Sequence, residues 1–158
     1  MRAVNLPERL WRERLIAYAP LIFWIGVIFY LSSSRGSMSE TSRFIRPILL
    51  FFFPNSSESA LLIYHGYIRK FAHFAEYAVL AFLAARAFYY SRSEKVRQLL
   101  YTFAVGLTVV VASIDEINQS LNSTRTGSGW DVLLDVTGGV LALFVFWIII
   151  GRRHRATT

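Results

Sequence analysis

The sequence of 158 residues contains no cysteine and is short of acidic side chains, with ten Asp and Glu against 17 Lys and Arg. The absence of cysteine excludes disulfide bonds and metal sites built on thiolates. The shortage of acid leaves a formal net charge of +7. In a soluble protein this charge would indicate nucleic acid as a partner. Here 54% of the residues are hydrophobic and concentrated in long blocks. Retention of Lys and Arg on the cytoplasmic side of a membrane therefore explains the charge, and no nucleic-acid partner is expected.

Four blocks are apolar over roughly the 20 residues that a membrane-spanning helix needs. They are residues 16–31, 71–90, 99–114 (with a polar continuation to 121) and 132–150. One core in a chain this small cannot bury several such segments, so the blocks predict an all-α membrane protein. A fifth run, 44–53, is shorter and contains Pro47, which favours an interfacial segment rather than a span. We expect a four-helix transmembrane bundle with this segment between helices 1 and 2, in one domain over 1–158 with basic tails at 1–15 and 151–158.

The first block has some features of a secretory signal peptide, because Arg9, Arg12 and Arg14 precede it. It has no small-residue cleavage motif, however, and it ends in a run of three serines that begins at Ser32. We therefore expect this block to be a retained helix.

The distribution of charge predicts the orientation of the bundle. With four spans, eleven of the 17 Lys and Arg fall in the two tails and in the link near residues 86–97, while six fall on the other side. Only three of the ten acids lie with the eleven cations. Since Lys and Arg accumulate in cytoplasmic loops, both termini are expected in the cytoplasm of a cell-membrane protein. The loops near 32–69 and 121–131 would then lie outside.

Ionisable side chains cluster in the segments that begin or end spans on that outer side. At 100° per residue, Lys70, His73, Glu76 and Tyr77 fall within an arc of roughly 120° on one helix face. Asp115 and Gln119 are four residues apart, and so are Asp131 and Asp135. Gly138 and Ala142 continue the Asp135 stripe, so that face can approach another helix closely.

Topology brings these segments to one end of the bundle, together with the loop that holds Arg125. The expected site comprises Lys70, His73, Glu76, Tyr77, Asp115, Glu116, Gln119, Arg125, Asp131 and Asp135. Charged groups inside a membrane indicate function by default. Like charges cannot all remain ionised together, so either protons or a cation must neutralise part of the set. Plainer interpretations are cationic anchors at a helix end, an acid that favours a helix dipole, and a structural salt-bridge network.

Four stretches of the sequence resemble the VanZ-like family, small bacterial-type membrane proteins related to a teicoplanin-resistance protein. They are residues 29–34 (FYLSSS), 70–77 (KFAHFAEY), 115–119 (DEINQ) and 125–139 (RTGSGWDVLLDVTGG). The family often has His where this chain has Asn118, which weakens any role for a second histidine. The resemblance implies a cell-envelope membrane protein with a connection to glycopeptide susceptibility, and it supplies no reaction.

Three functions remain open. The first is binding or processing of a lipid-anchored anionic envelope molecule of the polyprenyl-phosphate type. Phosphate would be held by Lys70 and Arg125, with Tyr77, Gln119, Asp131 and Asp135 as further ligand-binding residues. The second is a metal-assisted hydrolase or transferase, with His73, Glu76, Asp115 and Glu116 as catalytic candidates and a divalent cation such as Mg²⁺. The third is a non-catalytic assembly protein. Expected partners are membrane lipids and a lipid-linked cell-wall precursor or glycopeptide.

Overall fold

The computed structural model describes residues 6–121 and 128–156, and within them every regular element is helical. The elements are α1 (Leu6–Ser32), the short 3₁₀ turn η1 (Ser34–Gly36), α2 (Met38–Phe52), α3 (Glu58–Tyr89), α4 (Glu94–Gln98), α5 (Leu100–Ser120) and α6 (Gly129–Ala156). Four helices are long and apolar enough to cross a membrane, namely α1, α3, α5 and α6. The four predicted spans and the all-α class are thereby confirmed.

The third helix departs from the sequence prediction, because α3 begins at Glu58 rather than near Phe71. Residues 58–69 were expected in the outer loop near 32–69, but they are helical. Ser57 caps this helix, its hydroxyl accepting a hydrogen bond from the backbone N–H of Ala60. At 1.5 Å per residue, the 32 residues of α3 extend for about 48 Å, well beyond the ~30 Å of a hydrocarbon core. The N-terminal turns of α3 therefore reach past the apolar layer.

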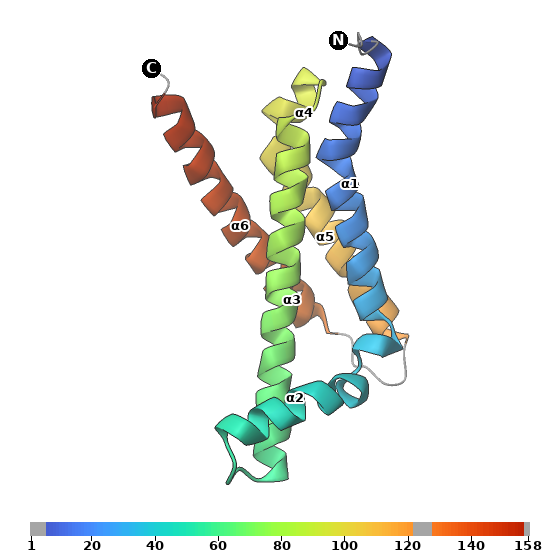
Figure 1. Cartoon of the computed structure of the whole chain (residues 1–158), viewed down its shortest axis with the longest axis vertical. Coiled ribbons are helices and arrows are strands. Elements are labelled where there is room, and N and C mark those ends of the chain that lie inside the picture. Colours follow the sequence, from blue (N-terminus) through green and yellow to red (C-terminus); the bar gives the residue numbers. More distant parts are fainter. Residues whose placement is uncertain (1–5, 122–127, 157–158) are drawn as a thin grey trace, which may run out of the picture.

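The helix α2 lies across this projecting part of α3 (Figure 1). Two contacts hold it there: Thr41 Oγ1 lies 3.0 Å from Nε2 of the buried His65, and Arg46 forms an ion pair with Glu58. The exposed side of α2 carries four apolar side chains at helical spacing: Phe44, Ile48, Phe51 and Phe52. An apolar stripe backed by a polar, docked side is typical of a helix that lies in the membrane interface. This is the short segment expected between the first two spans.

The central helix of the bundle is α3, which contacts α1, α5 and α6 beyond its projecting N-terminal part (Figure 1). Its buried face is rich in small residues, with Ala81, Ala84 and Ala85 fully enclosed. Small side chains allow helix backbones to approach closely, which is how helices associate in membranes.

The closest approach is between α3 and α6 at Gly138. A Cβ atom on Gly138 would lie only 2.3 Å from the backbone oxygen of Phe74, so α6 touches the α3 backbone directly. The neighbouring Gly139 faces α5, where a Cβ would lie 2.9 Å from Thr108 Cγ2. The prediction that the Asp135–Gly138 stripe permits close packing is confirmed at Gly138.

The bundle has two distinct ends. The start of α1, the end of α6 and the short α4 lie at the same end of the bundle, with the end of α6 splayed away from the other two (Figure 1). At the other end α1 and α5 finish, α6 begins and α2 lies across α3; we call this the α2 end. The described site residues proposed from the sequence belong to segments near the α2 end.

Candidate functional site

Three helices carry the predicted site residues to the α2 end. They are Lys70, His73, Glu76 and Tyr77 on α3, Asp115, Glu116 and Gln119 on α5, and Asp131 and Asp135 on α6. The tenth predicted residue, Arg125, lies outside the described residues. Helix α6 packs against α3 where Gly138 meets the backbone of Phe74. Asp135 lies about one turn before Gly138 on α6, and His73 directly precedes Phe74 on α3. This contact therefore holds Asp135 near His73.

Asp115 is buried and hydrogen-bonded by two side chains. It is 1% exposed, and its Oδ2 accepts hydrogen bonds from the hydroxyl of Tyr77 at 3.0 Å and from Nε2 of Gln119 at 3.1 Å. Its other oxygen, Oδ1, is buried without a hydrogen-bond partner among the residues described. Tyr77 and Gln119 therefore fix the carboxylate through one oxygen and leave the second available.

Asp135 shares this property, because it is 1% exposed and its Oδ1 also has no hydrogen-bond partner within residues 6–121 and 128–156. One ligand atom from each of His73, Asp115 and Asp135 lies within 4.8 Å of the others. The imidazole of His73 also approaches Glu76, with Nδ1 3.6 Å from Oε2. Two carboxylates and an imidazole from three helices thus converge inside the span, an arrangement whose chemistry suits a divalent cation.

Lys70 and Asp131 lie nearer the surface, whereas Glu116 is buried. Lys70 Nζ is 2.9 Å from Asp131 Oδ1, and the two side chains are 59% and 29% exposed. An ion pair this accessible contributes at most about 1 kcal/mol to stability. Glu116 accepts a hydrogen bond from the backbone N–H of Ser128, which joins the end of α5 to the start of α6.

A small cavity of about 180 Å³ opens among these side chains. It is lined by Met38, Gly66, Arg69, Lys70, His73, Glu116, Gln119, Asp131 and Leu134. Five predicted site residues are therefore in its wall, together with Arg69, which the sequence analysis did not include. Asp115, Asp135, Glu76 and Tyr77 are not among the lining residues. Because His73 belongs both to the wall and to the buried cluster, it connects the two.

A family model described as VanZ/LLP1 matches residues 16–150, which is most of the chain. The chain belongs to the VanZ/LLP1 family. The family likeness inferred from four sequence stretches is confirmed, and with the four apolar helices it identifies a membrane protein. No curated protein and no solved structure matches the chain.

Two residues of this VanZ/LLP1 protein support the site in ways that the sequence analysis did not assign. Ser32, at the end of α1, is buried, and its hydroxyl lies 3.5 Å from the backbone oxygen of Asp115. The amide of Asn118 donates to the same hydroxyl at 3.2 Å. Both belong to stretches that carry the family likeness, but a serine at a helix end is too common for its partner to be predicted.

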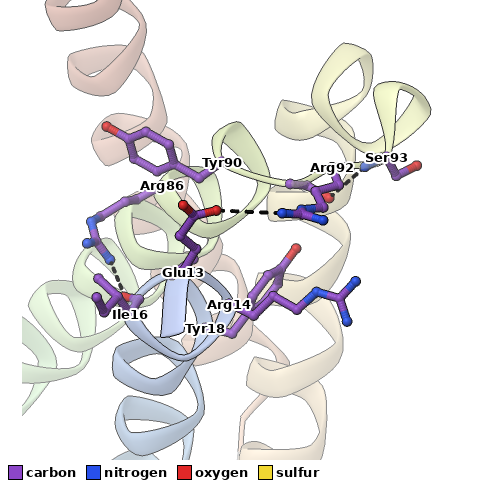
Figure 2. Close-up of a pocket in the computed structure, with 10 residues that line it drawn as sticks. Glu13, Arg14, Ile16, Tyr18, Arg86, Tyr90, Arg92 and Ser93 are labelled. Carbon is purple, nitrogen blue, oxygen red and sulfur yellow. Dashed lines mark hydrogen bonds and ion pairs between the residues drawn. The ribbon is translucent and has the colours of Figure 1, made fainter. Parts of the chain in front are cut away.

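The VanZ/LLP1 chain also has a larger cavity, of about 590 Å³, near the start of α1 and the end of α3. Figure 2 shows Glu13 of α1 between Arg86 and Arg92. Arg86 Nη1 donates to the backbone oxygen of Ile16 at 3.2 Å, and Arg92 lies 3.6 Å from Glu13. The guanidinium of Arg14 lies 5.8 Å from the ring centroid of Trp11. These arginines thus have partners within the protein, and the contacts of Arg86 and Arg92 tie α1 to the end of α3 and the link that follows it.

Proposed function

We propose that this VanZ/LLP1 protein binds the anionic head group of a lipid-anchored cell-envelope molecule, of the polyprenyl-phosphate type, at the α2 end. The observation that supports this most is the cavity near that end, whose wall combines cationic Arg69 and Lys70 with His73 and the amide of Gln119. Arginine and lysine recognise phosphate by charge-assisted hydrogen bonds. The acids Glu116 and Asp131 in the same wall are suited to accept hydrogen bonds from sugar hydroxyls.

The size of the cavity supports a head group rather than a whole amphiphile. At about 180 Å³ it is smaller than the roughly 300–1,000 Å³ of sites that enclose a drug-sized ligand. A lipid tail would therefore remain in the bilayer beside the protein. The exposed apolar stripe of α2 places Phe44, Ile48, Phe51 and Phe52 where the boundary between head groups and tails is expected.

The proposed orientation puts this site in the leaflet away from the cytoplasm. Both ends of the described chain lie at the end of the bundle away from α2 (Figure 1). In the sequence, the two tails and the link near residues 86–97 hold eleven of the 17 Lys and Arg. The positive-inside bias then assigns the α2 end to the outside. A lipid-linked cell-wall precursor is displayed on that side, which would connect the site to glycopeptide susceptibility.

The test is binding of a long-chain polyprenyl phosphate to the purified protein in EDTA, measured by native mass spectrometry or fluorescence competition. The matched ligands are the uncharged polyprenol of the same length and a phosphatidic acid. We expect the polyprenyl phosphate to bind most tightly. Equal binding of the polyprenol would rule out a phosphate site, and equal binding of phosphatidic acid would show that the polyprenyl chain is not recognised.

The matched variants are Lys70→Gln and Arg43→Gln, which remove one cation each at the same end of the molecule. Lys70 lines the cavity, whereas Arg43 pairs with Glu40 on α2 and does not line it. Loss of a charge-assisted hydrogen bond of about 1.5–3 kcal/mol predicts roughly tenfold to hundredfold weaker binding for Lys70→Gln. Arg43→Gln should bind normally. An equal loss in both variants would indicate general surface charge instead of a head-group site.

A further inference from the structure

We infer that His73, Asp115 and Asp135 form a binding site for one divalent transition-metal cation, with Mn²⁺ and Zn²⁺ as the best-matched ions. The inference stands on the contacts of these three residues and does not depend on the lipid ligand proposed above. The three donors come from three different helices, α3, α5 and α6, so the folded bundle creates the cluster.

The two aspartates of the cluster are buried and incompletely hydrogen-bonded. Each is 1% exposed, and each has an Oδ1 atom that is buried without a hydrogen-bond partner among the described residues. A buried polar atom in this condition is costly and requires an explanation such as a bound ion. Both residues belong to the same cluster, in which one carboxylate oxygen of each aspartate and one ring nitrogen of His73 lie within 4.8 Å of one another. A divalent cation would neutralise both carboxylates at once.

The spacing of the three donors also fits one ion. Two donors bound to the same ion lie at most roughly 4–5 Å apart, which is twice the bond lengths of about 2.0–2.5 Å. Donors on adjacent positions lie closer. A set whose members are within 4.8 Å therefore surrounds a volume of the right size for one ion, with small side-chain adjustments.

Neighbouring side chains support the proposed donors. Tyr77 and Gln119 both donate to Oδ2 of Asp115, which orients the carboxylate and leaves Oδ1 without a hydrogen-bond partner in the described part of the chain. Oε2 of Glu76 lies 3.6 Å from Nδ1 of His73, so a carboxylate is also close to the imidazole. Metal-binding side chains in proteins are held by such outer contacts, which fix ring orientation and raise ligand basicity.

The donor set selects the class of ion. Carboxylates suit Mg²⁺, Ca²⁺ and Mn²⁺, whereas imidazole suits later transition metals such as Zn²⁺. One imidazole with two carboxylates favours Mn²⁺ or Zn²⁺ over Mg²⁺ and Ca²⁺. Three protein donors leave coordination positions open, and His73 lines the adjacent 180 Å³ cavity. The ion would thus lie beside the space proposed for an anionic head group.

The first experiment measures binding of Mn²⁺ and Zn²⁺ to the full-length protein in detergent, after treatment with EDTA and without added lipid. We expect one ion per chain in the wild type, at least tenfold weaker binding in Asp135→Asn and Asp115→Asn, and wild-type binding in Asp131→Asn. Asp131 provides a matched control because it lies on the same helix and pairs with Lys70 instead of joining the cluster. No binding by the wild type, or equal losses in Asp131→Asn and Asp135→Asn, would overturn the inference.

The second experiment does not depend on whether the aspartate variants fold. Electron spin-echo spectroscopy of bound Mn²⁺ in protein labelled with ¹⁵N-histidine should show a directly coordinated imidazole nitrogen. The signal should persist in His65→Gln, because His65 contacts Thr41 and is not in the cluster, and it should vanish in His73→Gln. A spectrum without nitrogen coupling, or binding of Mg²⁺ as tight as that of Mn²⁺, would exclude His73 as a ligand. Because this assay contains no lipid and the lipid assay contains EDTA, the two proposals fail independently.

Discussion

Replacing Gly138 with alanine tests the contact that holds the two site-bearing helices together. The new Cβ would lie 2.3 Å from the backbone oxygen of Phe74, whereas an ordinary contact is roughly 3.4 Å or longer. The clashing atom belongs to the backbone of Phe74, so no side-chain rotation relieves the clash. We expect α6 to move away from α3 by about 1 Å over part of their interface. Forced overpacking costs typically about 1–3 kcal/mol, and this case belongs at the upper limit.

The assay is thermal unfolding of the purified protein in detergent, followed by the fluorescence of its four tryptophans. By the scaling known for soluble domains of this size, about 3 kcal/mol corresponds to a fall in Tm of roughly 6–12 °C. The control is Gly106→Ala on α5, where a Cβ would meet nothing within 4 Å. That variant should match the wild type or exceed it slightly, because alanine is the better helix former.

Metal binding at the site should weaken when the packing of α3 against α6 is disturbed. Gly138 is three residues after Asp135, and Phe74 directly follows His73, so separating the helices separates two of the three proposed metal donors. Gly138→Ala should therefore weaken Mn²⁺ binding at temperatures where the variant is still folded, while Gly106→Ala should not. If both variants melt like the wild type, α3 and α6 do not touch at this crossing and the described site geometry is wrong.

Three further predictions concern orientation and charge. In the cysteine-free chain, an impermeant thiol reagent applied to intact cells should label Ser123→Cys and spare Ser93→Cys, because residues 122–129 are expected outside; equal labelling would contradict the orientation. In metal-free protein, Asp115→Asn and Glu116→Gln should leave Tm unchanged or slightly raised, because each removes a negative charge from a group of acidic side chains. A large fall in the Tm of both variants would favour a structural salt-bridge network. Arg125→Ala should reduce binding of polyprenyl phosphate without lowering Tm, as measured by the ligand and melting assays together; unchanged binding would remove Arg125 from the proposed site.

Much of the fold follows from simple features of the sequence. Four apolar blocks of spanning length predict the four long helices, and helical spacing with alternating topology predicts that polar residues of three helices share one end. The proximity of His73, Asp115 and Asp135 follows from these two considerations. A helical turn is short and successive spans alternate in direction, so the depth of each residue in the membrane is nearly fixed.

Other features depend on contacts that no periodicity encodes. The N-terminal part of α3 is helical although its hydropathy is mixed, because α2 packs on it through His65 and Glu58. The link from Asn118 through Ser32 to the backbone of Asp115 joins residues 86 positions apart. The sequence predicted a polar end of the bundle, and only the packing showed which acids are buried as a cluster and which, like Asp131, stay near the surface.

The most direct test of the central claim, that the polar α2 end is a ligand site and not scaffold, is native mass spectrometry of protein released from its own membranes. The account predicts that the wild type and Arg43→Gln retain a phosphate-bearing polyprenyl lipid, and that Lys70→Gln loses it while remaining folded. A wild-type protein that carries only bulk phospholipid, in the same amount as Lys70→Gln, would contradict the account.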